Sequence, residues 1–382
     1  MSDIEENLQG LLEVRKVVVN YEDHQQEAGV FDMPVDLEHF KKFPMVDPPG
    51  THKKVGHDIR GEIRVDPNID LPDYSGPFRQ DLRFSDFSKE ALVNMLGMAD
   101  EYYGVTTRSW AAEVTERYGK EVMIDVQSEA WQLIVLPQLR RMIDEWMVLP
   151  DDEADAVVTE VEREVAARRD DGGTVTINPF KSDPKYLEHP KDQLVNLALG
   201  SHEYLLTVIE AWAAAIVMKY GLDAMFEFQW SLWSEKVLPG VKDLKAQWMN
   251  ISGNTVEAFM KDVQMDATSF PGKAFDMTFE MPEPDVGIFT FNKCISVDQW
   301  DALGRPDIAE KAAHISCPAA IIDTAKMYNP NMKVEILAIP PRQSKDYVCC
   351  KWRLSMRTED DPEYVPVELT KKQSGNDTHS VD

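Results

Sequence analysis

The chain has 382 residues, more than one ordinary domain holds, and 43% of them are apolar, which is enough for sizeable hydrophobic cores. Its formal net charge of −27 argues against binding to nucleic acid or to an anionic membrane surface, because both need clustered lysine and arginine. We interpret the acidic character as a feature that favours solubility.

The longest apolar run lies around Trp212–Met218 and falls well short of the roughly eighteen residues that a membrane span needs. The first residues are acidic and lack the pattern of a signal peptide, so we expect a cytoplasmic protein with no membrane partner. In a reducing cytoplasm the four cysteines are expected to be thiols or metal ligands rather than disulfides. The oligomeric state stays open, and a homo-oligomer is compatible with the sequence.

Residues 1–88 are expected to form an irregular, proline-rich arm rather than a domain. Proline removes a backbone donor and fixes φ, and its frequency between Pro34 and Pro77 argues against long helices there. Part of the arm is nevertheless expected to pack on the rest of the protein, because it is too apolar for a free tail. The aromatic residues that indicate this packing are Phe31, Phe40, Phe43, Tyr74 and Phe78.

The next part of the chain contains an internal repeat, in which segment 89–147 recurs at 191–249. Every matching pair is separated by 102 positions, and the matches include Tyr-Gly, Val-Leu-Pro and three tryptophans of each segment. Chance does not supply so many rare residues in one register. The tryptophan pairs are Trp110 and Trp212, Trp131 and Trp233, and Trp146 and Trp248.

The repeat predicts two similar helical units, at 89–170 and 191–272, joined by a linker at 171–190. Helical periodicity in each unit ends at Tyr-Gly, with Gly119 and Gly221 at the position that tolerates a positive φ. A later helix meets Pro137 or Pro239, which we expect to kink or restart it. The two units are expected to pack apolar face to apolar face around a pseudo-twofold axis, with the tryptophans in the core.

After the second unit the hydrophobic pattern changes to that of strands. We predict strands at 275–281 and 287–295, helices at 299–313 and 317–328, and strands at 332–339 and 347–356. Residues 273–357 would thus form a ββααββ module, an antiparallel sheet with helices on one face. Residues 358–382 are polar and are predicted to be a disordered tail. The fold class is therefore α+β.

All four cysteines fall in this module, at Cys294, Cys317, Cys349 and Cys350. His314 precedes Cys317 by three residues, which places both near one helix start. Alternation along the last strand puts Cys350 on the core side and Cys349 on the opposite face. We therefore expect Cys350 to approach His314 and Cys317 under the helices, where Cys294 at the end of the second strand can join them.

Three interpretations of this group stay open. Thiolates and imidazole suit zinc or iron, so His314, Cys317, Cys294 and Cys350 are candidate metal ligands, although their spacing is not diagnostic. Cys317 at a helix N-terminus is alternatively a candidate nucleophile, with His314 as its base. The third interpretation is that the cysteines are small, buried apolar residues.

Sequence motifs near both ends carry a resemblance to known families. The stretches 71–78 and 84–92, together with Ile339-Pro-Pro-Arg-Gln-Ser-Lys-Asp346, resemble an uncharacterised family common in anaerobic bacteria and archaea. The module and the helix Trp110-Ala-Ala-Glu-Val-Thr-Glu-Arg-Tyr-Gly119 are similar to the aminothiazoline-carboxylate (L-2-amino-thiazoline-4-carboxylic acid) hydrolase-like family. This resemblance implies hydrolysis of C–N or C–S bonds in a ring. The duplicated helical unit is a departure, since family members carry one.

The sequence therefore favours a small-molecule enzyme of the hydrolase or lyase type, assisted by zinc or iron at the Cys/His group. A cleft lined by tryptophan and methionine would suit an apolar or cyclic substrate. Because the cysteine module occurs once, a single active site is expected to belong to it. The alternative is a non-catalytic ligand-binding or structural protein whose cysteines are core residues.

Overall fold

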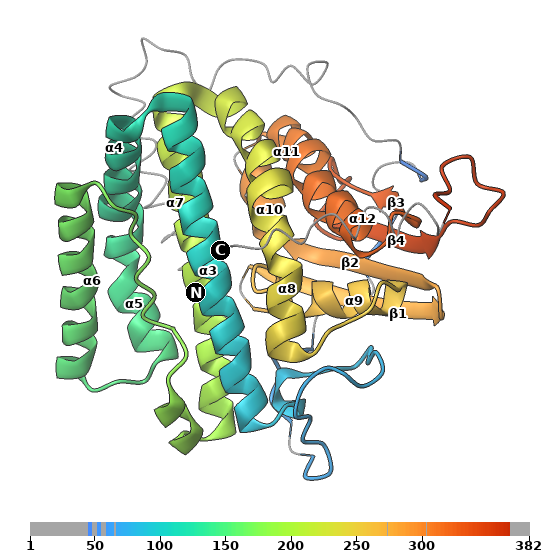
Figure 1. Ribbon diagram of the computed structural model, residues 1–382, viewed down its shortest axis with the longest axis horizontal. Helices are drawn as coiled ribbons and strands as arrows, with labels where there is room; N and C mark the ends of the chain where they lie inside the picture. Colours follow the sequence, from blue (N-terminus) through green and yellow to red (C-terminus); the bar gives the residue numbers. More distant parts are fainter. Residues whose placement is uncertain are drawn as a thin grey trace, which may run out of the picture.

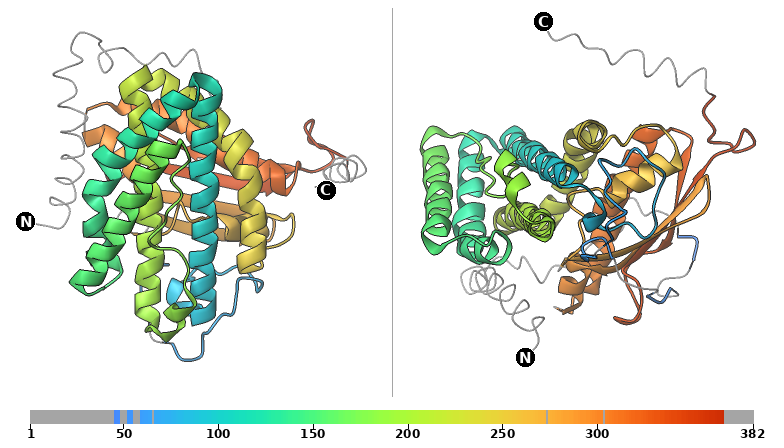
Figure 2. Two further views of the ribbon diagram at one scale, coloured as in Figure 1. Left: turned by 60° about the vertical axis from the view of Figure 1, so that its left-hand side comes forward. Right: turned by 90° about the horizontal axis from the view of Figure 1, so that it is seen from below.

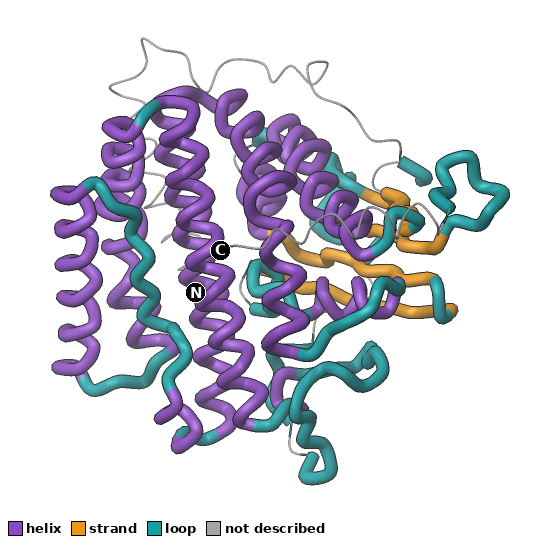
Figure 3. Tube along the Cα trace, viewed as in Figure 1, coloured by secondary structure: helices purple, strands orange, loops and turns teal. Residues whose placement is uncertain are grey.

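The computed structural model describes residues 45–47, 52–54, 59–64, 66–272, 274–302 and 304–366. Within these residues the chain is α+β, as the sequence predicts: helices come first and an antiparallel sheet follows (Figure 1). The strands gather on one side of the molecule with several short helices beside them, and the longer helices occupy the other side (Figure 3). The parts of the arm and tail at 1–44 and 367–382 lie outside the described residues.

Two long helices, α3 (Lys89–Tyr118) and α7 (Lys191–Ser231), run side by side through the middle of the helical part (Figures 1 and 2). Ser88 caps α3 by accepting a hydrogen bond from the backbone of Ala91 at 3.1 Å. The helix ends at Gly119, whose φ of 93° suits a residue without a Cβ. Helix α7 breaks at Gly221, where φ is 85°, before it continues.

Shorter helices follow each long one. After α3 come α4 (Lys120–Ala130), a π-helix (Trp131–Val135), α5 (Leu136–Trp146) and α6 (Asp151–Asp171). After α7 come another π-helix (Leu232–Val237), α8 (Leu238–Met249) and α9 (Val256–Gln264). Pro137 and Pro239 lie in the first turns of α5 and α8, each directly after a π-helix, and the helical run continues past both prolines.

The sheet consists, within the described residues, of β1 (Phe275–Glu283), β2 (Val286–Cys294), β3 (Met332–Ala338) and β4 (Cys350–Met356). Neighbouring strands are antiparallel in the order β1-β2-β4-β3. Between β2 and β3 the chain forms α10 (Ile295–Ala302), α11 (Pro306–Pro318), a π-helix (Ala319–Asp323) and α12 (Thr324–Tyr328). The central pair Phe289 and Trp352 stacks on the inner face of the sheet and is fully buried.

Two hydrophobic cores follow from this arrangement. The larger one fills the space between the helices and holds Trp110, Trp131 and Trp212, all fully buried, whereas the other three tryptophans of the repeat, Trp146, Trp233 and Trp248, are partly buried against it. The smaller one lies between the sheet and α9 to α12, and it contains Trp352 and the cysteines. Helix α7 is long and apolar enough to cross a membrane by length and composition alone, but most of its apolar stretch is buried in the larger core, as in the core helix of a globular domain.

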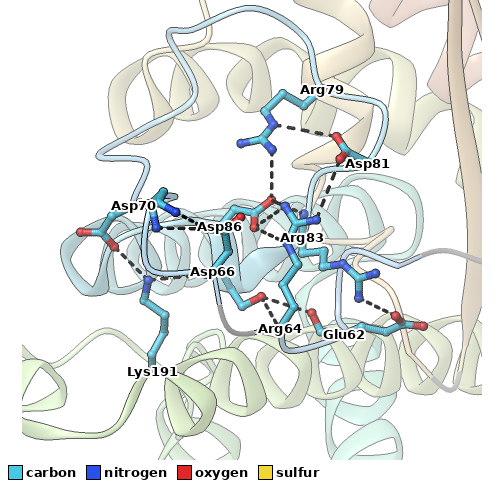
Figure 4. A network of polar contacts seen from close by, with 11 residues as sticks. Glu62, Arg64, Asp66, Asp70, Arg79, Asp81, Arg83, Asp86 and Lys191 are labelled. Atoms are coloured by element: carbon cyan, nitrogen blue, oxygen red, sulfur yellow. Dashed lines mark hydrogen bonds and ion pairs between the residues drawn. The ribbon is translucent and has the colours of Figure 1, made fainter.

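Charged side chains link the described residues of the N-terminal arm to one another and, through Lys191, to the helices (Figure 4). Asp86 is buried and accepts three hydrogen bonds from Arg64, at 3.0, 2.7 and 2.8 Å, and one from the backbone of Arg83 at 3.1 Å. Lys191, at the start of α7, pairs with Asp70 at 2.8 Å. The arm therefore packs against the helical part through residues 59–88.

The chain also returns to the sheet after β4. The side chain of Asn331 donates a hydrogen bond to the Val365 carbonyl at 2.8 Å and accepts one from the Val365 amide at 2.7 Å. Residues 358–366 of the predicted disordered tail are therefore held at the start of β3.

Candidate functional site

The four cysteines gather where α11 meets β2 and β4. Cys317 lies in the last turn of α11, and Cys350 is the first residue of β4. The two thiols interact, which lowers the pKa of Cys317 and raises that of Cys350 well above its ordinary value. Cys350 is buried, whereas Cys317 is partly exposed. Cys350 therefore approaches Cys317 under the helices, as strand alternation predicts.

The position of Cys317 in its helix differs from the prediction. The sequence places Cys317 at a helix start, but α11 runs from Pro306 to Pro318 and continues through the π-helix Ala319–Asp323 into α12. Pro318 lacks the N–H that an α-helix would use here, and the wider π-turn that follows absorbs this loss. Because Cys317 lies inside this continuous helical run and not at a helix N-terminus, the helix dipole does not favour its thiolate. The interaction with the Cys350 thiol lowers the pKa of Cys317 instead.

Cys349 also departs from the prediction, because it is fully buried instead of facing outward. It precedes β4, and the loop before it folds over its thiol. The guanidinium of Arg342 donates to the Cys349 sulfur at 3.1 Å and pairs with Asp301 at 2.8 Å and with Asp298. Burial raises the pKa of Cys349 to about 12, although Arg342 opposes the shift. Cys349 therefore stays a thiol at neutral pH.

Cys294 completes the group from the end of β2. Its backbone N–H donates a hydrogen bond to the sulfur of Cys349. The thiol of Cys294 is also close enough to Cys317 and Cys349 to interact with them electrostatically. Burial raises the pKa of Cys294 well above its ordinary value. Cys294 and Cys317 are partly exposed, and of the four thiols Cys317 is the one whose pKa is lowered.

His314 is buried on α11, one helical turn before Cys317. Residues three apart on an α-helix are neighbours on its surface, so the helix itself holds the imidazole near the Cys317 side. The described contacts bring the four thiols together, whereas His314 is placed near them by its helical position.

The predicted metal ligands do not form a metal site among the described residues. No group of three or more histidine, cysteine, aspartate or glutamate side chains in this part of the chain is placed to hold a metal ion. Zinc or iron at His314, Cys317, Cys294 and Cys350 stays a prediction from the sequence.

A buried polar network that sequence reasoning missed lies nearby, between α8, α9 and α12. Lys245 is almost fully buried and pairs with Asp262 and Asp266, each at 2.7 Å. Tyr328 donates to Asp262 at 2.8 Å. Burial lowers the pKa of Lys245, but the two carboxylates outweigh it, so the pKa is raised and the ammonium keeps its charge. The network locks the helical part to the sheet module through α12.

One signal in the sequence could have found this network. Val241, Leu244 and Met249 recur at helical spacing along α8 and are buried, and Lys245 lies on the same buried face. A lysine within an apolar helical stripe indicates a buried partner of opposite charge, because an unpaired ammonium in a core is too costly. The partners themselves lie on other helices and leave no local pattern.

Comparison with known proteins adds no relative. No protein-family model matches the chain. No curated protein and no solved structure matches it significantly either. The function must therefore be argued from the residues of the cysteine group and their surroundings.

Proposed function

We propose that the protein is a small-molecule enzyme of the hydrolase type, in which the Cys317 thiolate attacks a cyclic C–N or C–S substrate. The observation that carries the proposal is the partly exposed Cys317 thiol, whose pKa is lowered by its interaction with the buried Cys350 thiol. A nucleophilic cysteine needs both a stabilised thiolate and access for the substrate. The substrate class rests on the resemblance to aminothiazoline-carboxylate hydrolases.

The residues suggest the following order of events. The Cys317 sulfur bonds to the ring carbon, and the ring opens as the C–S or C–N bond breaks. The leaving atom takes a proton, and His314 is the candidate acid because it lies one turn away on α11. Water then attacks the covalent intermediate with His314 as base and restores the thiolate. Cys350 is a positioning residue that acts through Cys317.

Turnover of 2-aminothiazoline-4-carboxylate tests this proposal. Purified protein is expected to open the ring with the gain of one water, whereas a lyase would release a product without that gain. Replacement Cys317→Ala should lower the rate by at least ~1,000-fold, because the nucleophile is lost. Cys294→Ala is the matched control, since it removes a neighbouring thiol that is not the nucleophile, and it should retain most activity.

Two outcomes would contradict the proposal. One is equal turnover by the wild-type protein and Cys317→Ala. The other is absence of turnover combined with a Cys317 thiol that iodoacetamide does not modify until the protein is unfolded. The second outcome would favour the non-catalytic alternative, which gains support from the place of Cys349 and Cys350 in the smaller hydrophobic core.

We further infer that segments 89–170 and 191–272 are two copies of one helical unit. The backbone supports this, because Gly119 and Gly221 are 102 positions apart and break their helices with similar angles, φ 93° and ψ 163° against φ 85° and ψ 173°. A π-helix follows each glycine, at Trp131–Val135 and at Leu232–Val237, and the last residues of the two π-helices are 102 positions apart. π-Helices are rare, so two at matching positions indicate common descent.

Contacts between the two segments also support a pseudo-twofold axis. Positions 117 and 129 of the first segment correspond to 219 and 231 of the second. Arg117 donates to Ser231 at 2.8 Å, and Lys219 pairs with Glu129 at 3.4 Å, so the same two positions meet once in each direction. Reciprocal contacts of this kind are expected of a twofold interface. A duplicated unit that buries its own face in this way explains why the chemistry is assigned to the unrepeated module.

A further inference from the structure

We propose that the face of the sheet that carries Thr278, Thr290 and Asn292 holds a binding site for a small neutral molecule with an amide group. These three side chains, called the polar row below, lie on β1 and β2. The site goes beyond the proposed hydrolase and does not depend on it, because the polar row is on the opposite face of the sheet from Cys350 and the smaller core.

Strand register brings the polar row together on one face. Phe289 and Phe291 of β2 pack in and against the smaller core, so the alternate residues Thr290 and Asn292 point to the other face. Thr278 of β1 is the register partner of Thr290. Opposite residues of an antiparallel pair have Cβ atoms about 5 Å apart, and residues two apart along a strand are separated by about 7 Å. The three side chains are therefore within reach of one small molecule.

The polar row is buried without partners. Asn292 is 0% exposed and Thr290 is 1% exposed. Within the part of the chain that the structure describes, both polar atoms of the Asn292 carboxamide and the hydroxyl oxygens of Thr278 and Thr290 are buried and make no hydrogen bond. Such a group loses the hydrogen bonds that it makes to water in the unfolded chain, and native proteins rarely leave several together in this state. The polar row therefore indicates that a molecule from solution completes its hydrogen bonds.

A loop and a helix cover the Asn292 end of the polar row. Cys349 lies on the same face as Asn292, and its thiol donates to the Asn292 backbone carbonyl at 3.8 Å. Arg342 lies over Cys349, with its guanidinium 3.1 Å from the sulfur, and it pairs with two aspartates of α10. The loop 340–346 and α10 are thus joined over this end of the sheet, in agreement with the complete burial of Asn292.

The chemistry of the polar row selects a neutral ligand. Asn292 presents a donor and an acceptor side by side, and a threonine hydroxyl can act as either. An anion would leave the Asn292 carbonyl oxygen unpaired, and the charge of Arg342 nearby is already balanced by Asp298 and Asp301. A metal cation would find no carboxylate within the polar row to neutralise it. An amide, lactam or urea carries its own N–H and C=O side by side, so it can form two parallel hydrogen bonds with the Asn292 carboxamide.

Binding of 2-pyrrolidone to the full chain, followed by ligand-observed NMR, tests the proposal. This cyclic amide holds its N–H and C=O on the same side, as pairing with the Asn292 carboxamide requires. We expect saturable binding to the wild-type protein, and binding at least ~10-fold weaker for N-methyl-2-pyrrolidone, which lacks the donor. Asn292→Leu should weaken 2-pyrrolidone binding by a similar factor. Thr290→Val is a second variant, which reports if the first fails to fold.

Stability without ligand separates a binding role from a structural one. Leucine and valine are close in size to the residues they replace and remove unpaired polar atoms. Asn292→Leu and Thr290→Val should therefore melt at the temperature of the wild-type protein or up to ~3 °C higher. Thr107→Val is the matched control, because the hydroxyl of this buried threonine donates to the Tyr103 carbonyl at 3.0 Å. It should melt ~3 °C lower and bind 2-pyrrolidone as the wild-type protein does.

Several results would overturn the proposal. One is a wild-type protein that shows no saturable binding of 2-pyrrolidone or binds the N-methyl compound equally well. Unchanged binding by Asn292→Leu would do the same, as would a loss of stability in both Asn292→Leu and Thr290→Val, since their side chains would then already be paired. So would a crystal structure, grown with 2-pyrrolidone, in which ordered water alone meets the polar row. None of these results bears on turnover at Cys317, so the site and the proposed hydrolase can fail separately.

Discussion

The phenol ring of Tyr118 stacks on that of Tyr220, with 4.0 Å between the ring centroids and 5° between the ring planes. The two residues are 102 positions apart and each directly precedes the glycine that breaks its helix, Gly119 or Gly221. Further down the same helices Trp110 stacks on Trp212, with 6.1 Å between centroids. Corresponding residues meet at two levels, which indicates that α3 and α7 run parallel on either side of a common axis.

The stacking of Tyr118 on Tyr220 predicts that the effects of replacing these two residues on the free energy of unfolding are coupled. In a double-mutant cycle of Tyr118→Ala and Tyr220→Ala, measured by urea unfolding, we expect a coupling free energy of about 1 kcal/mol, because stacked rings contribute about this much beyond their buried area. Tyr186→Ala provides the control, since Tyr186 packs in a different region against His189 and should combine additively with Tyr118→Ala. Additivity in the Tyr118 and Tyr220 cycle would contradict the stacking.

At Gly97 and Gly200 the packing between the two segments leaves no room for an added methyl group. A Cβ on Gly200 would lie 2.6 Å from the Cβ of Trp146, and one on Gly97 would lie 2.8 Å from the ring of Trp248. Each of these tryptophans comes from the other segment. Because the core is close-packed, Gly97→Ala and Gly200→Ala should each lower the free energy of unfolding by about 1–3 kcal/mol.

The matched control for these glycines is Gly76→Ala, where an added Cβ meets no atom within 4 Å. Its effect on the free energy of unfolding should be within about 0.5 kcal/mol, as for other surface changes. Thermal or urea unfolding of the three variants measures the contrast. Equal stability of Gly200→Ala and Gly76→Ala would show that Trp146 does not pack on α7 as described.

The buried lysine makes the largest predicted change in stability. Replacement Lys245→Met leaves the Asp262 and Asp266 carboxylates together without their cation, and we expect a loss of about 3–5 kcal/mol in the free energy of unfolding. Lys242→Met is the control on the same helix, because Lys242 is only partly buried and donates to a backbone carbonyl. Adding Asp262→Asn to Lys245→Met should recover part of the loss, and no recovery would argue against the network.

His202 predicts a dependence of stability on pH. Burial lowers the pKa of its imidazole from 6.5 to about 4, against the opposing effect of its hydrogen bond to the Ala267 carbonyl. Between these two pH values the unfolded chain binds a proton that the folded protein excludes. The contribution of His202 is therefore complete above pH 6.5 and is lost as the pH falls toward 4, a change of about 3 kcal/mol.

The variant His202→Asn isolates the contribution of His202 to the pH dependence of stability, because asparagine can donate to the Ala267 carbonyl but does not titrate. Urea unfolding of both proteins at a series of pH values between 7 and 4 measures the difference. The wild-type protein should lose about 3 kcal/mol more than the variant over this range. Parallel curves would mean that His202 does not titrate as described, since the carboxylates are common to both proteins.

Much of the fold is encoded in local pattern. The change from helical to alternating periodicity near residue 273 predicts an α+β chain with an antiparallel sheet at its end, and the structure has this arrangement. Tyr-Gly at 118–119 predicts the end of α3, because glycine alone adopts a φ of 93° without strain. The helix start expected at Cys317 is wrong, since Pro318 is accommodated by a π-turn that no local rule anticipates.

One part of the candidate site is likewise encoded in local pattern, and another part depends on tertiary packing. Alternation along β4 by itself determined that Cys350 points into the core, because side chains of a strand alternate between its faces whatever surrounds it. Only the tertiary structure decided that Cys349 is buried as well, beneath Arg342, and that Lys245 meets Asp262 and Asp266. These contacts join separate elements, and they form only when the helices and the sheet pack together. Backbone periodicity is local, whereas the burial of a charge or a thiol is a property of the packed molecule.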